Sequence, residues 1–267
     1  MLVSDISSPF SSILLKGIGD CCERYGYGVL ITNSNDNPRK ERDYILSMMD
    51  QRVEGLIINT TGQNDEFLQQ IAKNGVPIVL ADRGMDETIF DTVRTADEAV
   101  TAEVMEHLKE RGFSRVGWFS QPVNNGTRKL RQKAYRNACR DILMIVPEEY
   151  ILEDDDPLKV EGQIRKFFAA NPGERIAIYT GNGVATLYVV KALQRMGLQW
   201  PDDLGLCGFN NWDWTELVGG GITVVSQPSY RVGHECVKRL MARIHRNRHA
   251  KARMIELDCR LILRRST

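Results

Sequence analysis

Short apolar runs alternate along the chain with longer stretches in which apolar residues recur every three or four positions. The runs predict buried strands, at residues 27–32, 53–59, 76–81, 115–120, 150–152, 175–180, 204–209 and 222–226. The stretches predict helices, at residues 10–25, 38–49, 64–74, 97–111, 157–170, 184–196 and 230–246. Because strand and helix alternate at intervals that fit right-handed βαβ units, we predict a doubly wound α/β fold.

The length of the chain and the spacing of the runs divide it between two sheets. A chain of 267 residues suits one large domain or two domains of ordinary size. The interval between residues 81 and 115 is the natural place for a first crossing between sheets, near Thr95. The terminal segment, residues 255–267, alternates apolar and polar positions and predicts one final strand.

The predicted strand at residues 204–209 stops abruptly at Asn210 and Asn211. In open α/β sheets ligands bind outside the carboxyl ends of strands, so two amides at such an end predict a binding surface. The alternative is that both asparagines only form a turn, for which asparagine is well suited. The glycines at 219–221 and the extended segment after them favour the binding surface, because they bring a second strand end to the same region.

Charge and cysteine content narrow the class of protein. The 35 basic and 35 acidic residues cancel, so this chain has no nucleic-acid footprint overall. It contains no run of 18 apolar residues, which excludes a membrane span, and Asp5 and Asp20 argue against a secretory signal. Six cysteines lie within apolar patterns and without metal-ligand spacing, so we expect buried thiols in a reducing cytoplasm rather than disulfides.

Motifs for catalysis are sparse. The histidines have no partnered serine, cysteine or aspartate, and they lie at positions 107, 234, 245 and 249. The acidic run at residues 154–156 precedes Pro157 and predicts a helix N-terminus, with a magnesium site as the alternative. Gly181 and Gly183 flank Asn182 after a strand but lack the further residues of a phosphate loop. Gly17 and Gly19 predict close helix packing. We therefore expect no enzyme, no catalytic residue, no cofactor and no metal.

Arg131 lies early in a basic helix that follows the polar loop QPVNNGT. Its guanidinium can make bidentate bonds to a carboxylate or to vicinal hydroxyls. The alternative is a solvated arginine on a charged helix surface.

Several stretches together resemble one known family. They are VSDISSPFSSILLKGI, ERDYILSMMDQRVEGLII, VPIVLADR, RVGWFSQP, RKLRQKAYRNA, AIYTGNGVATLYVVKALQRMGLQWPDDLGLCGFNN, GITVVSQPSYRVG and LILRRS. They span essentially the whole chain, and it resembles the effector-binding domain of the lactose/galactose-repressor (LacI) family of bacterial transcription regulators.

The resemblance implies two lobes of the periplasmic-binding-protein-like type I fold, joined by three crossover segments. The first lobe would hold residues 1–95 and 227–254, and the second residues 96–226 and 255–267. A small sugar or sugar-acid effector would bind between the lobes. The family implies a homodimer that binds operator DNA through a helix-turn-helix headpiece. No helix-turn-helix is recognisable in this chain, and no membrane contact is expected.

The resemblance also assigns effector-binding residues. Pro9 and Phe10 would lie at the cleft edge, where the aromatic ring can stack on a sugar. The polar set would be Asn125, Thr127, Arg131, Asn182, Asn210 and Gln227. Gly183 departs from the family because an aspartate usually follows the asparagine at 182.

Asn210 also departs from the family, since it replaces an aspartate that commonly accepts hydrogen bonds from ligand hydroxyls. A neutral amide removes a negative charge that would repel an anion, so we hypothesise a sugar-acid effector whose carboxylate pairs with Arg131. The alternative is local variation without a change of ligand. An exported sugar-binding protein of a transporter is the alternative function, and a small-molecule enzyme on the same sheets is a third.

Overall fold

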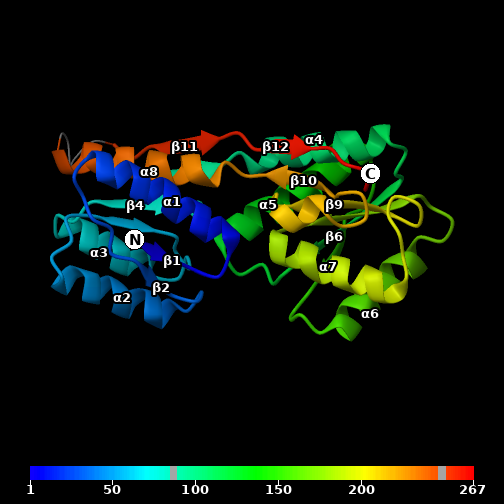
Figure 1. Cartoon of the computed structure of the whole chain (residues 1–267), viewed down its shortest axis with the longest axis horizontal. Helices are drawn as coiled ribbons and strands as arrows, with labels where there is room; N and C mark the ends of the chain where they lie inside the picture. Colours follow the sequence, from blue (N-terminus) through cyan, green and yellow to red (C-terminus); the bar gives the residue numbers. More distant parts are fainter. Residues whose placement is uncertain (85–88, 246–250) are drawn as a thin grey trace. The chain divides into compact units, whose positions relative to one another are not determined.

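The structure is a computed structural model that describes residues 1–84, 89–245 and 251–267 (Figure 1). These residues form two compact units. The first contains Met1–Thr95, Asn125–Thr127 and Pro228–Leu257, and the second contains Ala96–Asn124, Arg128–Gln227 and Asp258–Thr267. Each unit has its own six-stranded sheet, and the chain passes from one unit to the other after Thr95, Asn124, Thr127, Gln227 and Leu257. The α/β fold class predicted from the sequence is confirmed.

The first unit is a parallel sheet in the order β11-β5-β4-β3-β1-β2. Its strands are β1 (Leu2–Val3), β2 (Thr32–Asn33), β3 (Leu56–Ile58), β4 (Ile78–Ala81), β5 (Asp91–Thr95) and β11 (Met254–Leu257). Its helices are α1 (Pro9–Arg24), α2 (Pro38–Asp50), α3 (Asp65–Lys73) and α8 (Ser229–His245).

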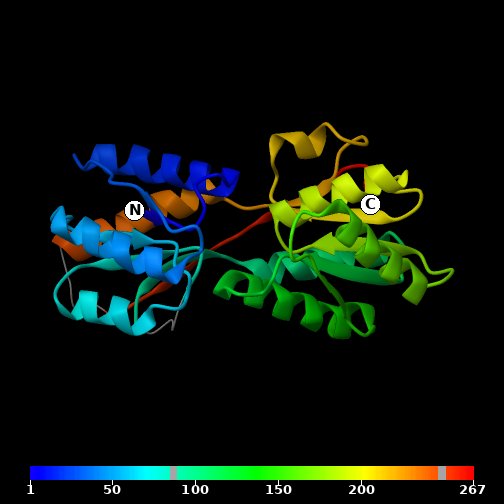
Figure 2. The ribbon, with the colours of Figure 1, turned by 90° about the horizontal axis from the view of Figure 1, so that it is seen from below.

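Successive strand residues of the first unit face opposite sides of the sheet, so each face has its own core. Val3 and Ile57 join the apolar cluster under α1 and α8, whereas Leu2 and Leu56 join the cluster under α2 and α3. Figure 1 shows α1 and α8 above the sheet and α2 and α3 below it, and Figure 2 shows the same unit from below. β3 and β4 are short and buried along their whole length, which explains their continuous apolar runs.

Glycine allows α1 and α8 to pack in direct backbone contact. A Cβ added at Gly17 would lie 2.1 Å from the Tyr230 carbonyl oxygen. A Cβ at Gly233 would lie 2.3 Å from the Leu14 carbonyl oxygen. The close packing predicted for Gly17 is therefore confirmed, but the same prediction for Gly19 is wrong, because nothing lies within 4 Å of its Cβ position.

The second unit has the sheet order β12-β10-β9-β8-β6-β7, parallel except for β12, which runs antiparallel to β10. Its strands are β6 (Arg115–Ser120), β7 (Glu148–Ile151), β8 (Ile176–Thr180), β9 (Gly205–Phe209), β10 (Thr223–Ser226) and β12 (Arg260–Ile262). The helices are α4 (Asp97–Glu110), α5 (Gly126–Ala138), α6 (Pro157–Ala170) and α7 (Gly183–Met196), with a π-helical turn at Cys139–Leu143 and a 3₁₀ turn at Asp213–Glu216. α6 and α7 cover one face of the sheet, and α4 and α5 cover the other.

Two strand predictions need correction, and one strand was not predicted. The segment predicted as a strand at 27–32 pairs only at Thr32–Asn33, and Leu30 and Ile31 are exposed. The single final strand is instead two, β11 and β12, in different sheets. The sequence analysis did not predict β5, because its first residue, Asp91, is a charged group inside the core.

The acidic run begins α6, as predicted. Asp156 Oδ1 accepts a hydrogen bond from the Leu158 backbone N–H at 3.0 Å, which caps the helix. Asp154 pairs with Lys159 at 2.6 Å. No group of three or more histidine, cysteine, aspartate or glutamate side chains suited to a metal occurs among the described residues. The alternative of a magnesium site at this run therefore has no support.

The six cysteines are free thiols; five are buried and Cys259 is half-buried. Burial raises the pKa of the Cys139 thiol to about 11 and raises that of Cys22 as well. Within the described ranges, no helix is both long and apolar enough to cross a membrane. His249 lies outside the described residues.

Candidate functional site

Polar residues follow neighbouring strands at the carboxyl edge of the second sheet. β8, β9 and β10 are adjacent and parallel, so the residues that follow them meet at one edge. Asn182 follows β8, Asn210 follows β9 and Gln227 follows β10. The structure therefore brings three of the predicted effector-binding residues together.

Asn210 links all three strand ends. Its Oδ1 accepts a hydrogen bond from the Gly183 backbone N–H at 3.1 Å, and its Nδ2 donates to Gln227 Oε1 at 2.7 Å. The residue is buried, with a φ of 72° in the left-handed region that asparagine tolerates. Asn210 thus has the left-handed backbone expected of a turn, and its amide also links the polar strand ends.

Asn182 caps the start of α7 with its side-chain oxygen, and its side-chain nitrogen is left as a donor. Its Oδ1 caps the helix by accepting from the Ala185 backbone N–H at 2.9 Å. Its Nδ2 is buried and has no hydrogen-bond partner among the described residues. A buried donor without a partner is rare in a folded protein, and an explanation for one is a ligand that supplies the acceptor.

Gly183 leaves room for an indole ring. A Cβ at this position would lie 2.6 Å from Cζ2 of Trp212, which lies against the start of α7. The family's usual aspartate therefore cannot fit here without moving the tryptophan. The departure at 183 is a steric consequence of Trp212, and it needs no change of ligand to explain it.

Arg131 is a buried, fixed residue, so the surface alternative is wrong. Its exposure is 5%. Its Nε donates to Asp97 Oδ2 at 2.8 Å and its Nη1 to the Gly181 carbonyl oxygen at 3.2 Å. Its guanidinium carbon lies 3.7 Å from the centre of the Phe209 ring. Ion pair, carbonyl and cation–π contact together hold the guanidinium beside the ends of β8 and β9.

Two further buried polar atoms lie near Gly181, and the sequence analysis missed both. Trp118 Nε1 and Ser120 Oγ have no hydrogen-bond partner among the described residues. A Cβ at Gly181 would lie 2.6 Å from Ser120 Oγ and 2.7 Å from Trp118 Cζ2. Together with Asn182 Nδ2, these atoms give the edge three buried polar atoms without a hydrogen-bond partner among the described residues. Ser120 ends β6, so the strand-end argument could have found it.

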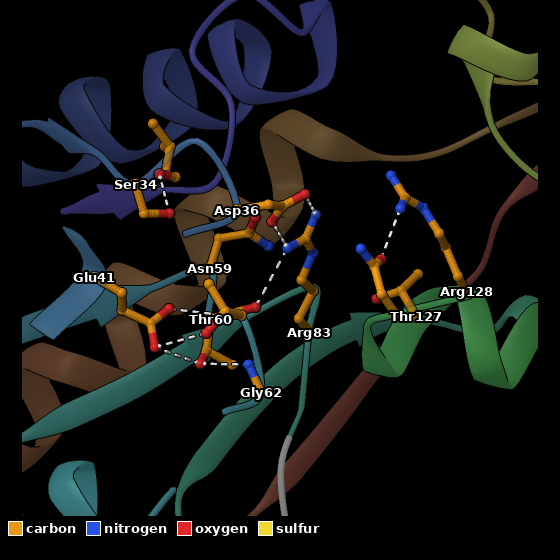
Figure 3. A network of polar contacts seen from close by, with 12 residues as sticks. Ser34, Asp36, Glu41, Asn59, Thr60, Gly62, Arg83, Thr127 and Arg128 are labelled. Atoms are coloured by element: carbon orange, nitrogen blue, oxygen red, sulfur yellow. Dashed lines mark hydrogen bonds and ion pairs between the residues drawn. The ribbon is translucent and has the colours of Figure 1, made fainter. Parts of the chain in front are cut away.

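The carboxyl edge of the first sheet carries a second polar network (Figure 3). Arg83, which follows β4, forms an ion pair with Asp36 and donates to the Thr60 carbonyl oxygen at 3.4 Å. Asn59 Nδ2 donates to the Ala81 carbonyl oxygen at 2.8 Å. These contacts tie the ends of β2, β3 and β4 together.

Glu41 of α2 joins this network by accepting hydrogen bonds from the loop after β3, and Figure 3 shows its carboxylate turned toward Thr60. The side chain is fully buried. It accepts hydrogen bonds from the Thr61 backbone N–H at 2.6 Å, from Thr60 Oγ1 at 3.3 Å and from Asn64 Nδ2 at 2.9 Å. A buried carboxylate surrounded by donors fixes the loop after β3.

The remaining predicted residues lie in the first unit. Pro9 is the exposed first residue of α1, and Phe10 is half-buried against the apolar cluster of that helix. Asn125 and Thr127 are buried, and Thr127 Oγ1 donates to the Asp82 carbonyl oxygen at 3.1 Å. Asp82, the partner of Thr127, and its neighbour Arg83 were not among the predicted site residues.

Comparison with known proteins identifies relatives over the whole chain. Residues 1–264 match the family described as "Periplasmic binding proteins and sugar binding domain of LacI family". The HTH-type transcriptional regulator KdgR of Bacillus subtilis is 31% identical over 269 residues, which cover 99% of this chain and 78% of that protein. The regulator PtxS of Pseudomonas putida is 32% identical over 267 residues, covering 100% and 77%.

Solved structures share the fold. A LacI family transcriptional regulator from Enterococcus faecium with bound ribose superposes with a TM-score of 0.84 at 22% identity, covering 100% of this chain and 97% of that one. A periplasmic binding protein/LacI transcriptional regulator from Alkaliphilus metalliredigens, complexed with D-xylulofuranose, gives 0.85 at 21% identity, with 100% and 97% covered.

Proposed function

We propose that this chain, which belongs to the LacI family, senses a small sugar or sugar acid and thereby controls how its regulator binds operator DNA. The chain is the ligand-binding domain of a LacI-type transcription regulator, and its curated relatives are regulators and not enzymes. The operator-binding headpiece, the homodimer and the cytoplasmic location are parts of the proposal that follow from the family.

One observation carries the choice of ligand class. The carboxyl edge of the second sheet places Trp118 Nε1, Ser120 Oγ and Asn182 Nδ2 in buried positions without partners among the described residues. Arg131 lies at the same edge. A ligand rich in oxygen atoms supplies acceptors to all of these groups, and an apolar ligand would leave them unsatisfied. The ribose and D-xylulofuranose bound to the two solved neighbours support a sugar-like ligand.

The charge of the site supports the finer proposal of a sugar acid. Asp97 already balances Arg131, so the pair is neutral as a unit. An aspartate at position 210 would make the edge negative, whereas Asn210 leaves it neutral and still able to donate from Nδ2. A carboxylate ligand therefore meets donors and no uncompensated anion.

The proposed mechanism is a population shift. Residues of both units, including Phe10 and Thr127 of the first unit, would contact the effector in one arrangement of the lobes. An effector that contacts both units favours that arrangement by its difference in affinity for the two states. Rotation of the lobes would then change the spacing of the paired headpieces on a palindromic operator.

Isothermal titration calorimetry on this chain tests the ligand class. We expect aldonates or keto-sugar acids to bind at least tenfold more tightly than the matching neutral sugars, a difference of about 1.4 kcal/mol. Preference for neutral sugars would contradict the sugar-acid proposal and leave the sugar sensor intact. Binding of neither class would contradict both.

A second experiment separates a regulator from the sugar-binding protein of a transporter. The full regulator, with its headpiece, is titrated against the DNA upstream of its own gene by fluorescence anisotropy. We expect binding that changes at least tenfold when the effector is added, as in allosteric coupling of about 1–3 kcal/mol. DNA affinity that is unaffected by a saturating effector would contradict the proposed control of transcription.

A further inference from the structure

A cavity lies in the second unit, at the edge of its sheet where the parallel strands begin. It has a volume of about 1200 Å³. Arg111 after α4, Gly197 after α7, the loop that leads to β9 and the residues after β12 form its walls. Because the candidate effector residues lie at the opposite ends of these strands, this cavity is a different place in the fold. This volume exceeds the range of about 300–1,000 Å³ that is typical of small-molecule sites, so a metabolite would fill only part of the cavity.

The cavity carries an excess of positive charge. Three guanidinium groups line it, from Arg111, Arg264 and Arg265, against one acidic side chain, Asp202. Arg264 also pairs with Glu216 at 3.6 Å, so Arg111 and Arg265 carry the positive charge that remains against Asp202. Convergent arginines from separate segments are the arrangement that binds phosphate and carboxylate groups with two parallel hydrogen bonds.

The three arginines are not equally engaged. Arg264 donates to Asn211 Oδ1 at 2.8 Å and to the Ile222 carbonyl oxygen at 2.9 Å, so the rest of the unit fixes it. Arg111 and Arg265 are exposed, and their guanidinium groups form no ion pair or hydrogen bond within the described residues. Two guanidinium groups are therefore available to an incoming anion.

An indole N–H adds a neutral donor to the same wall. Trp200 lines the cavity with an exposure of 8%, and its Nε1 has no hydrogen-bond partner among the described residues. Gly219, which also lines the cavity, would place a Cβ 2.5 Å from this nitrogen. The indole nitrogen is therefore a buried donor without a partner, next to the Gly219 segment of the cavity wall.

The glycines after the 3₁₀ turn hold the arginine side chains close to this loop. Gly219, Gly220 and Gly221 have φ values of +55°, +79° and +93°. A Cβ at Gly220 would lie 3.0 Å from Arg265 Cδ, and one at Gly221 would lie 2.7 Å from Arg264 Cδ. Side chains at these positions would push the arginine stems away, so the loop fits the cationic wall only as glycine.

We propose that this cavity is a second ligand site, which binds a small organic phosphate. Two available guanidinium groups suit a phosphate dianion, which offers three acceptor oxygens. Leu198, Pro201 and Leu263 provide apolar lining for a carbon skeleton. The site is independent of the proposed effector site, so either proposal can fail without the other.

Calorimetry with ribose 5-phosphate and AMP as probes, and with ribose, adenosine and inorganic phosphate as controls, tests the proposal. We expect at least one organic phosphate to bind saturably, tenfold or more tightly than inorganic phosphate or its phosphate-free counterpart. Arg111→Glu with Arg265→Glu should weaken that binding at least tenfold and leave the effector affinity unchanged. Arg39→Glu with Arg231→Glu, which alters two exposed arginines of the first unit, makes the same charge change and should leave phosphate binding intact.

Trp200 provides a readout of location. The indole N–H resonance that disappears in Trp200→Phe should shift on titration with the bound organic phosphate, while the other three indole signals stay in place. Equal affinity for inorganic phosphate, equal weakening by the first-unit control, or no binding at 10 mM probe would each overturn the proposal. A shift only in the other indole signals would place the phosphate elsewhere and overturn it as well.

Discussion

The side-chain amide of Asn210 donates a hydrogen bond to Gln227 Oε1 at 2.7 Å and so joins the end of β9 to the end of β10. Its oxygen simultaneously accepts from the backbone N–H of Gly183 at the start of α7. The two functions of a primary amide, donor and acceptor, are both used. An aspartate could keep only the second bond unless Gln227 turned its own amide to donate.

Asn210→Asp should reverse the ligand preference. The new carboxylate adds a negative charge to an edge where Asp97 already balances Arg131. We expect sugar-acid affinity to fall at least tenfold, about 1.4 kcal/mol, and neutral-sugar affinity to hold or rise. Calorimetry measures both. Asn211→Asp is the matched control, because Asn211 is exposed and accepts from Arg264, so its charge should leave ligand affinity unchanged.

Arg131→Met should destabilise the second unit by about 3–5 kcal/mol, because it leaves the buried Asp97 carboxylate without its counter-charge. Adding Asp97→Asn should recover much of that loss. Urea unfolding of the two single variants and the double variant gives the coupling energy. Strictly additive losses would show that the ion pair contributes nothing to stability, contrary to this prediction.

Asp91 should make the first unit sensitive to acid. Burial acts to raise the pKa of this carboxyl, but hydrogen bonds from Arg243, the Arg253 backbone N–H and Arg239 outweigh it and lower the pKa. A lowered folded pKa stabilises the fold above the unfolded value of about 3.9. That contribution is lost as the pH falls from this value through the folded pKa.

Urea unfolding between pH 7 and pH 3 measures the contribution of Asp91. We expect Asp91→Asn to be less stable at pH 7 and to lose less stability on acidification than the natural chain. Asp141→Asn is the control, because Asp141 forms an exposed pair with Arg140, and solvent screening makes such pairs contribute little to stability. A natural chain with flat stability down to pH 3 would contradict the assignment.

Gly17→Ala and Gly19→Ala should have opposite effects on stability although they lie two residues apart in α1. The Cβ at 17 collides with the Tyr230 carbonyl oxygen, which forces α1 and α8 apart and should cost about 1–3 kcal/mol. The Cβ at 19 meets nothing, so alanine there should stabilise the helix by up to about 1 kcal/mol. Thermal unfolding of the two variants is the comparison, and equal melting temperatures would refute the packing argument.

The alternating pattern predicted the fold class because central strands such as β3 and β8 lie between helices and are buried along their whole length. The pattern could not predict a strand that contains polar residues whose partners lie far away in the sequence. Asp91 begins β5, and its counter-charges, Arg239 and Arg243, come from the other end of the chain. The pattern also treated residues 255–267 as continuous, because alternation does not record which sheet a strand joins.

The candidate site was also predicted only in part from the sequence. The strand-end argument located Asn210, and the resemblance named Asn182 and Gln227, because residue type and position are visible in sequence. The missing partners of Trp118 and Ser120 are not visible, because a donor is known to lack an acceptor only once everything around it is placed. Likewise the steric need for Gly183 depends on an indole 29 residues away.

The two-residue step between β11 and β12 has a consequence for synthesis. β11 is an edge strand of the first sheet and β12 an edge strand of the second, and only Asp258 and Cys259 separate them. A ribosome synthesises these strands after every other strand of the two sheets, so neither sheet acquires its last strand while the earlier residues are emerging. Both sheets are therefore completed only after the short segment that contains β11 and β12 has been synthesised. A nascent chain that stops before this segment exposes two unpaired sheet edges at once.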